Sequence, residues 1–399
     1  TGTLHTYERD RAVLAWCRFR GVAWEEMPQN GVHRGKIFKE KGFRFSDHLN
    51  QMLTQERPLP ATGHWAPLPW YPENPKEVRE DKPGRLRGGR AQALHLLEIF
   101  LSPSTLLAYP GAISSPNTAI TGCSRLSPYL AFGVLSDGEV FRAVHSQYVR
   151  LKNQGDPVAS QRLEEAVRFF LERLYWRAAY HQAFERNHTR EHQVELAPFN
   201  GQREALLIPE WLDAWQQGKT GVPYIDAAMR MLAHTGWLNM RLRGTVASFA
   251  LNELWLPWRE VGLHLAREFL DYDAPIHWSQ VQIHAGSAKA CDPLTYNPKK
   301  QAQEHDPEGR FIRRWLPELS RVPLEHLTEP WLMSPAMQSK ASCRIGVEYP
   351  APPVNLKQAH DAARERVTAL RQEKAPPPNR FWDQRERLRR EISQISLFD

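Results

Sequence analysis

Apolar residues recur at helical spacing through most of the chain beyond residue 90, and strand-type alternation is scarce there. In the segment 163–184, for example, Val167, Phe170, Leu171 and Leu174 fall on one helical face. The pattern predicts a mainly α fold, with helices over 91–101, 163–184, 226–234, 242–255, 261–270 and 356–372. Gly236 favours an end for the third of these helices.

The first 90 residues follow a different pattern. Residues 7–21 predict a helix with Val13, Leu14 and Cys17 on one face, and residues 22–24 predict a short strand. Since one helix and one strand cannot bury a parallel sheet, residues 1–56 are interpreted as the remnant of an α/β domain. Residues 57–90 are rich in Pro, Gly and charge, which predicts a linker. A helical domain is expected over 91–345, followed by a C-terminal segment over 346–399 with a charged helix at 381–395.

Composition limits the class of protein. Hydrophobic residues make up 41% and charged residues 24%, which is typical of a soluble globular chain. No apolar run is long enough to span a bilayer and the chain does not begin with a signal peptide, so we expect a cytoplasmic protein with no membrane partner. The net charge of +7 permits nucleic acid as a partner, although a solvated surface explains it equally well. The 14 Trp residues indicate large aromatic cores or stacking sites.

The four cysteines, Cys17, Cys123, Cys291 and Cys343, lie far apart and form no CxxC pair. A zinc site or a disulfide framework is therefore not expected, and no metal site is predicted. Reduced thiols are the favoured interpretation, and an iron–sulfur cluster formed by all four remains an alternative.

One motif has the features of an anion site. In residues 122–130 (GCSRLSPYL), Ser127 suits an N-cap and Pro128 the first helical position. Free N–H groups at that helix end, two hydroxyls and the guanidinium of Arg125 together favour an anion. A capped surface helix explains the same residues. Downstream, Ser136 and Glu139 form a capping box that opens another helix.

A second motif has the features of a polar pocket. Asp271 and Asp273 are two residues apart after a predicted helix, and His277 lies six residues beyond the first of them. These side chains either line a pocket or form a helix cap and a surface turn, and spacing alone favours the cap and turn.

These motifs and several others resemble, in the same order, those of the DNA photolyase and cryptochrome family. The matching residues are 123–127 (CSRLS), Trp176-Arg177, 218–223 (GKTGVP), 226–230 (DAAMR), Gly236-Trp237, Arg241-Leu242-Arg243, Asp271 with Asp273, and the run 297–319. The resemblance implies a two-lobed helical FAD-binding domain of photolyase type, preceded by a small α/β remnant. Residues 7–35 are similar to the end of the family's antenna domain, and most of that domain has no counterpart here. No antenna pigment is therefore expected in this chain.

The resemblance implies FAD as the cofactor. It implies that Arg243 pairs with Asp271 beside the flavin, and that His277 lies near flavin N5 as a proton or hydrogen-bond donor. The residues it assigns to FAD are Tyr109, Cys123, Ser124, Arg125, Leu126, Ser127, Met240, Arg243, Asp271, Tyr272, Asp273 and His277.

The resemblance also implies damaged DNA as the partner, with single-stranded DNA as one form of it, and we expect a monomer. Trp176 is expected to stack on extruded bases. The residues assigned to DNA are Arg173, Trp176, Arg177, Arg241, Lys300 and Gln301, and those assigned to the reaction are Trp176, Arg243, His277 and Trp258.

Departures from the family pattern concern the lesion pocket and the electron route. Arg173 stands where cyclobutane-dimer photolyases have Glu, Met240 where they have Asn, and Ile283 where they have a second Trp. Asn239 and Met240 replace the paired histidines of (6-4) photolyases. Of the family's three-Trp electron wire only the middle member, Trp258, is kept, because Val281 and Ala205 occupy the other places. Trp278, Trp255 and Trp237 are the candidates for another route.

Two functions follow from the resemblance. One is a light-dependent photolyase that repairs cyclobutane pyrimidine dimers. The other is a cryptochrome-type blue-light photoreceptor without repair activity, which the lesion-pocket departures favour.

Overall fold

The computed structural model describes residues 2–25, 81–153, 157–289 and 291–372. The described chain is almost entirely helical, and its one isolated β-bridge joins Ile345 and Tyr349. The predicted mainly α fold is confirmed. The α-helices are α1 (Leu4–Arg20), α3 (Arg90–Phe100), α4 (Pro103–Ala112), α5 (Pro116–Gly122), α6 (Ser127–Ala131), α7 (Asp137–Lys152), α8 (Pro157–Arg186), α9 (Pro209–Gln216), α10 (Pro223–Thr235), α11 (Met240–Ser248), α12 (Trp258–Glu268), α13 (Ala274–Ala285), α14 (Pro298–His305), α15 (Arg310–Trp315), α16 (Pro335–Ala341) and α17 (Leu356–Gln372).

Short 3-10 turns connect several of the helices, and one π-helical turn follows α11. The 3-10 turns are η1 (His188–Glu191), η2 (Ala197–Phe199), η3 (Glu204–Leu206), η5 (Pro317–Leu319), η6 (Leu324–His326) and η7 (Pro330–Leu332), and the π-helical turn is η4 (Phe249–Glu253).

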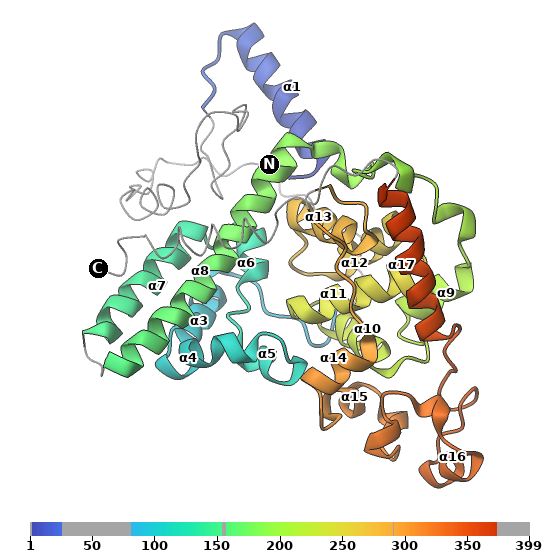
Figure 1. Ribbon diagram of the computed structural model, residues 1–399. Helices are drawn as coiled ribbons and strands as arrows, with labels where there is room; N and C mark the ends of the chain where they lie inside the picture. The colour runs from blue at the N-terminus through green and yellow to red at the C-terminus, as the bar shows by residue number, and fades with distance from the viewer. Residues whose placement is uncertain (1, 26–80, 154–156, 290, 373–399) are drawn as a thin grey trace.

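The helices form two lobes, each with its own apolar core. In the first lobe α8 packs against α4 and α7, and its buried core includes Leu106, Phe141, Phe170 and Leu171. Figure 1 shows α3, α4, α7 and α8 on one side of the molecule, α9 to α14 and α17 on the other, and α5 between them.

The second lobe is built around α10, α11, α12 and α13, with Phe249, Leu251, Val261 and Phe311 in its core. Helix α13 packs against α8 of the first lobe as well as against α11 and α12. It therefore joins the two lobes, and Asp271 and Asp273 immediately precede it.

Most of the predicted helices are present with shifted ends. Residues 356–372 form α17 as predicted. Gly236, in the left-handed conformation, closes α10, and its N–H donates to the carbonyl of Leu232. The capping box of Ser136 and Glu139 opens α7. Pro-led helices such as α4 and α9 were not predicted.

The single helix expected over 242–255 is wrong in detail. Asn239 caps α11 by accepting a hydrogen bond from Leu242 N, so the helix begins at Met240. The chain then widens into η4, where Leu254 N donates to Phe249 O. Trp255 has a φ of 51° and ends the helical run.

Two local expectations near the chain start and the anion motif are wrong. Residues 22–25 are irregular rather than a strand, with Val22 and Trp24 exposed and Gly21 in the left-handed conformation at the end of α1. Ser127 is the first residue of α6 rather than its cap. Leu126 takes the cap position without a side-chain hydrogen bond.

Some sequence predictions fall outside the described residues. The charged helix at 381–395 and most of the proposed linker at 57–90 are among them. In the part of the chain that is described, no helix combines the length and the apolar composition needed to cross a membrane.

Candidate functional site

The predicted pair between Arg243 and Asp271 is present. One guanidinium nitrogen, Nη2, lies 2.9 Å from Oδ1 and 2.7 Å from Oδ2 of Asp271. Arg243 Nε donates to the carbonyl of Leu238, and its guanidinium lies 4.1 Å from the ring centroid of Phe269. Because the Asp271 side chain is only 2% exposed, this pair is a rigid neutral unit in the wall of the site.

Asp273 belongs to a second buried charge cluster. Its Oδ2 accepts hydrogen bonds from Arg177 Nη1 and from His181 Nε2, the latter at 3.0 Å. Arg177 Nε lies 3.3 Å from Oδ1 of Asp137, and Nη2 donates to the carbonyl of Leu130 at 3.2 Å. The prediction that Arg177 contacts DNA therefore needs correction, since this side chain is buried and its charge is taken by two carboxylates.

His277 is buried beside these carboxylates, on the first turn of α13. Burial lowers the pKa of His277 to about 4, and the hydrogen bond to the Gly262 carbonyl only partly opposes this shift. Its Nε2 donates to that carbonyl at 2.8 Å. The imidazole is therefore neutral near pH 7 and its N–H is already used. The expected role as a proton donor to the flavin does not fit this geometry.

An aromatic group surrounds His277. Its ring centroid lies 5.2 Å from that of Tyr272 and 5.0 Å from that of Trp278. Trp278 Nε1 donates to the Tyr272 hydroxyl at 3.0 Å, and its ring packs edge-on against Trp258 at 5.7 Å. Burial raises the pKa of Tyr272 to about 12, so its hydroxyl stays protonated.

In the anion motif, Arg125 has no acidic partner among the described residues. Arg125 adopts a φ of 52°, and its guanidinium lies 5.0 Å from the ring centroid of Trp237. Among the described residues its buried Nε finds no hydrogen-bond partner. A half-buried guanidinium in this state is prepared to receive an anionic group.

The other residues assigned to FAD lie around this segment. Cys123 contacts both lobe cores, and burial raises the pKa of its thiol to about 12. Tyr109 and Leu126 are buried in the first-lobe core. Ser124 is half-buried and Ser127 is exposed, while Met240, at the start of α11, is 48% exposed.

Two DNA candidates lie on α8. Arg173 is half exposed, and its guanidinium lies 4.4 Å from the ring centroid of Phe169. Trp176 is half-buried, with ring contacts to Tyr175 at 5.6 Å and Tyr180 at 6.1 Å. Trp176 immediately precedes Arg177 on α8, and because successive helical residues point about 100° apart, the two side chains lie on different faces of the helix.

The remaining DNA candidates lie on α11 and α14. Arg241 is half-buried and lies 5.1 Å from the Tyr296 ring, while Lys300 is exposed. Gln301 is 7% exposed, and its Oε1 has no hydrogen-bond partner in the described chain. Buried Gln301 is therefore less accessible to a nucleic acid than its neighbour Lys300.

Sequence reasoning missed Asp137 and His181. Asp137 lies within the capping box of Ser136 and Glu139, and its local sequence does not distinguish it from a surface residue. His181 follows Arg177 by four residues on the same helix, and that spacing is the one sequence signal for the pair.

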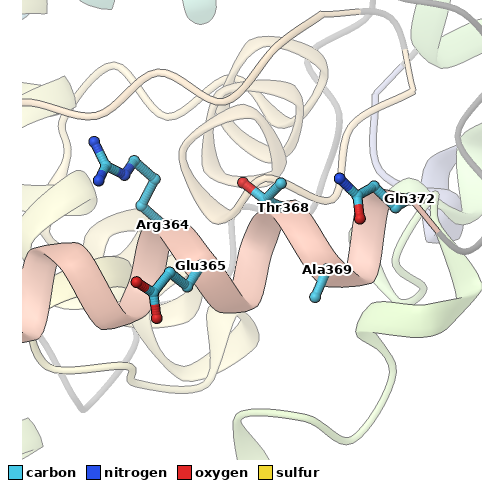
Figure 2. Close-up of a pocket in the computed structure, with 5 residues that line it drawn as sticks. All are labelled: Arg364, Glu365, Thr368, Ala369 and Gln372. Carbon is cyan, nitrogen blue, oxygen red and sulfur yellow. The ribbon is translucent and has the colours of Figure 1, made fainter.

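Neither a metal centre nor a second ligand pocket is evident among the described residues. No group of three or more of their His, Cys, Asp or Glu side chains is placed to hold a metal ion. An open surface pocket lies along α17, and Figure 2 shows that all five residues that line it belong to that one helix: Arg364, Glu365, Thr368, Ala369 and Gln372. The polar groups of several elements do not converge there, so we assign it no ligand.

The described chain is thus a two-lobed helical module in which Asp271 and Asp273 pair with arginines before α13, and the Nε of Arg125 has no hydrogen-bond partner among the described residues. Residues 170–369 match the family model described as the FAD binding domain of DNA photolyase. A deoxyribodipyrimidine photo-lyase of Alkalihalophilus pseudofirmus is 31% identical over 287 residues, 71% of this chain and 54% of that protein. Cryptochrome-1 of Arabidopsis thaliana is 32% identical over 296 residues, 73% of this chain and 41% of the plant protein.

Solved structures agree with these matches. A Synechocystis cryptochrome has a TM-score of 0.64 at 28% identity, covering 72% of this chain and 58% of that one. A class III photolyase from Agrobacterium tumefaciens has a TM-score of 0.72 at 22% identity, covering 93% and 78%, and it supports the fold alone. The chain belongs to the DNA photolyase and cryptochrome family, and FAD is its cofactor. It spans about half the length of these two curated relatives.

The residues present fit FAD. The Arg125 guanidinium, whose Nε is buried and unpaired, suits the pyrophosphate. Oδ1 of Asp273 is buried without a hydrogen-bond partner in the described chain, so it can accept from an N–H group of the ring system. The Arg243–Asp271 pair completes the ring side of this site.

Proposed function

We propose that this protein is a light-dependent DNA photolyase that repairs cyclobutane pyrimidine dimers. The observation that carries the proposal is the position of Trp176 on α8. This indole is half-buried and directly precedes Arg177, which binds Asp273 on the ring side of the FAD site. This position on α8 supports a role for Trp176 as a stacking surface for extruded bases near the FAD site.

In the proposed reaction, bound and reduced FAD supplies a light-driven electron that splits the dimer. The chain's own residues bind and orient. Trp176 stacks on the extruded lesion, while Arg173, Arg241 and Lys300 contribute positive charge to DNA phosphates. The neutral Arg243–Asp271 pair keeps the ring side free of net charge at that point.

For flavin reduction we propose a route through Trp278 and Trp258. These rings contact each other, and Trp278 also contacts His277 beside the FAD site. Trp255 is a poorer candidate because Arg203 and Arg366 lie 4.1 Å and 5.2 Å from its ring centroid, whereas Trp278 has one arginine, Arg259, at 5.9 Å. Cations near an indole disfavour its oxidation to a cation, and two close ones do so more than one distant one.

A second candidate function is a cryptochrome-type blue-light photoreceptor without repair. It is favoured by Ile283, which is 5% exposed and packs with Ala288 and Cys291 where photolyases of the dimer class have a lesion-contacting Trp. This side chain is buried in a small apolar cluster and offers no stacking surface. The names of the relatives are divided between photolyase and cryptochrome.

Illumination of the FAD-reduced protein with dimer-containing oligonucleotides, single-stranded and double-stranded, tests the proposal. Recovery of absorbance in the thymine band supports repair. An absence of recovery with FAD bound and reduced rejects repair and leaves the photoreceptor function.

Two tryptophan variants test whether Trp176 belongs to the lesion-binding site. Trp176→Ala is expected to weaken binding of the damaged strand by about tenfold to about a hundredfold, because stacking contributes roughly 1–3 kcal/mol per base. Trp16→Ala, at an exposed tryptophan of α1, is the matched control and is expected to bind normally. Equal binding by both variants would remove Trp176 from the proposed site.

A further inference from the structure

Four buried side chains form a charge cluster that includes Asp273, one of the two carboxylates assigned to the ring side of FAD. Asp137 opens α7, Arg177 and His181 lie one turn apart on α8, and Asp273 precedes α13. Their exposures are 4% for Asp137, 9% for Arg177 and 5% for His181, and the Asp273 side chain is 8% exposed. Three elements from both lobes thus bring their charges together away from water.

The charges in this cluster do not balance. Asp137 and Asp273 share the single guanidinium of Arg177, so with a neutral His181 the cluster carries one excess negative charge. Asp271, by contrast, has Arg243 to itself. An uncompensated buried charge is costly, and binding one proton removes it.

Several polar atoms of the cluster are free to bind that proton. Both carboxylate oxygens of Asp137 and Nδ1 of His181 are buried and have no hydrogen-bond partner among the described residues. Asp273 Oδ1 is in the same state. Buried polar atoms are rarely left unpaired, so these atoms indicate a missing proton or a missing ligand group.

We propose that Asp137, Arg177, His181 and Asp273 form a one-proton site that compensates the charge of the bound flavin ring. The proton resides on Asp137, and it is held more tightly when the ring is negatively charged. By linkage, the protonated cluster in turn stabilises the reduced ring. This inference rests on FAD binding, and it is independent of whether the protein repairs DNA.

The pKa shifts of the two carboxylates in the cluster agree with this proposal. Burial raises the pKa of Asp137, and the charges of Arg177 and His181 oppose this shift without cancelling it. Burial also disfavours ionisation of Asp273, but its interactions with His181 and Arg177 outweigh burial, so the pKa of Asp273 is lowered. A proton therefore goes to Asp137 before Asp273.

Three other titratable groups are assigned to the ring side of the site: Arg243 on α11, Asp271 before α13 and His277 on the first turn of α13. Arg243 and Asp271 neutralise each other, and His277 is neutral near pH 7, so these three groups add no net charge to the ring side. The cation Arg125 belongs to the anion motif before α6, which is assigned to the pyrophosphate. The excess negative charge therefore arises in the four-residue cluster itself.

The proton balance gives a measurable consequence. Reduction of bound FAD by two electrons from the electrode, with uptake of one proton from solvent, would leave one negative charge on the ring. The cluster then takes a second proton from solvent. For a two-electron couple each proton contributes about 30 mV per pH unit to the slope of midpoint potential against pH. The wild-type slope is therefore expected to approach about 60 mV per pH unit over part of the range between about pH 6 and about pH 9.

The test is spectroelectrochemical titration of the FAD-loaded wild type, Asp137→Asn and the control Asp213→Asn. Asp137→Asn removes the excess charge, so its slope is expected to stay near about 30 mV per pH unit. Asp213 is exposed on α9, and its variant is expected to titrate as wild type does. If Asp137→Asn does not fold, Asp137→Ser, which removes the same carboxylate, is measured in its place.

Two results would overturn the proposal. One is a wild-type slope near about 30 mV per pH unit at every pH. The other is a steep slope that persists without the Asp137 carboxylate, since the second proton would then sit on the ring or elsewhere. Failure to repair dimers leaves both measurements unaffected, so the two proposals fail separately.

Discussion

Removing the carboxylate of Asp271 is the most direct test of the ring side of the FAD site. In Asp271→Ala, Arg243 keeps its hydrogen bond to the Leu238 carbonyl and its contact with Phe269, but it loses both bonds to carboxylate oxygens. The Asp271 side chain is almost fully buried, but the Arg243 side chain that is left without its counter-ion is 21% exposed, so water partly replaces the lost carboxylate. Breaking a fully buried pair from one side costs about 3–5 kcal/mol, and the cost here is expected at or below the lower end of that range.

The effect of Asp271→Ala on stability and on FAD affinity is expected in two measurements. Urea unfolding of the apoprotein should show the lower stability directly. Fluorescence titration with FAD should show a dissociation constant raised by about tenfold to about a hundredfold, since each factor of ten corresponds to about 1.4 kcal/mol. Asp271→Asn keeps the shape and part of the hydrogen bonding, so its effect should be smaller in both assays.

The matched control is Glu318→Gln. Glu318 also pairs with an arginine through two bonds, at 2.6 Å and 3.2 Å from Arg230, but its side chain is 23% exposed. A partly exposed pair contributes about 1 kcal/mol or less, and it lies outside the proposed site. If Glu318→Gln loses FAD as strongly as Asp271→Ala does, or if Asp271→Ala retains FAD fully, the ring-side assignment is refuted.

Three further predictions concern other parts of the molecule. Arg125→Gln should weaken FAD binding by about tenfold or more while leaving riboflavin binding unchanged, because only FAD carries the pyrophosphate that a guanidinium recognises. His360 on α17 makes a hydrogen bond from Nδ1 to Glu253, which raises the pKa of His360 above its ordinary value. The free energy of unfolding should therefore fall as the pH rises through this raised pKa, and urea unfolding at several pH values measures the fall. Gly262→Ala should destabilise the protein by about 1–3 kcal/mol in the same assay, because an added Cβ would lie 2.3 Å from the Trp278 ring.

Each of these three has its own control. Equal losses of FAD and riboflavin affinity in Arg125→Gln would place the arginine elsewhere than at the phosphates. His360→Ala should remove the pH dependence, and its persistence would assign it to another group. Gly111 lies in α4 with open space around its Cβ position, so Gly111→Ala should leave stability unchanged or raise it by up to about 1 kcal/mol.

His360 and Glu253 both make the free energy of unfolding fall as the pH rises. The raised pKa of His360 means that its stabilising contribution is complete at low pH and is lost as the imidazole deprotonates. Burial raises the pKa of Glu253, so its ionisation also disfavours the folded state as the pH rises. The two effects therefore add.

Sequence alone was sufficient for features that depend on near neighbours or on motif order. The end of α10 at Gly236 and the capping box of Ser136 and Glu139 involve residues within a few positions of each other. The succession of motifs identified the family, and with it the Arg243–Asp271 pair. The position of the π-helical turn after α11 was missed because it depends on how the surrounding helices pack.

The tertiary structure decided the charges of the site. Arg177 and Asp273 are 96 residues apart in sequence, and no spacing rule predicts that they meet, or that Asp137 and His181 join them. Sequence offered Arg177 as a DNA contact and His277 as a proton donor. Burial made the first an internal counter-ion and the second a neutral imidazole bonded to Gly262. Residue types fix which charges are available, but which of them remain ionised, paired or exposed depends on desolvation and on contacts across the fold.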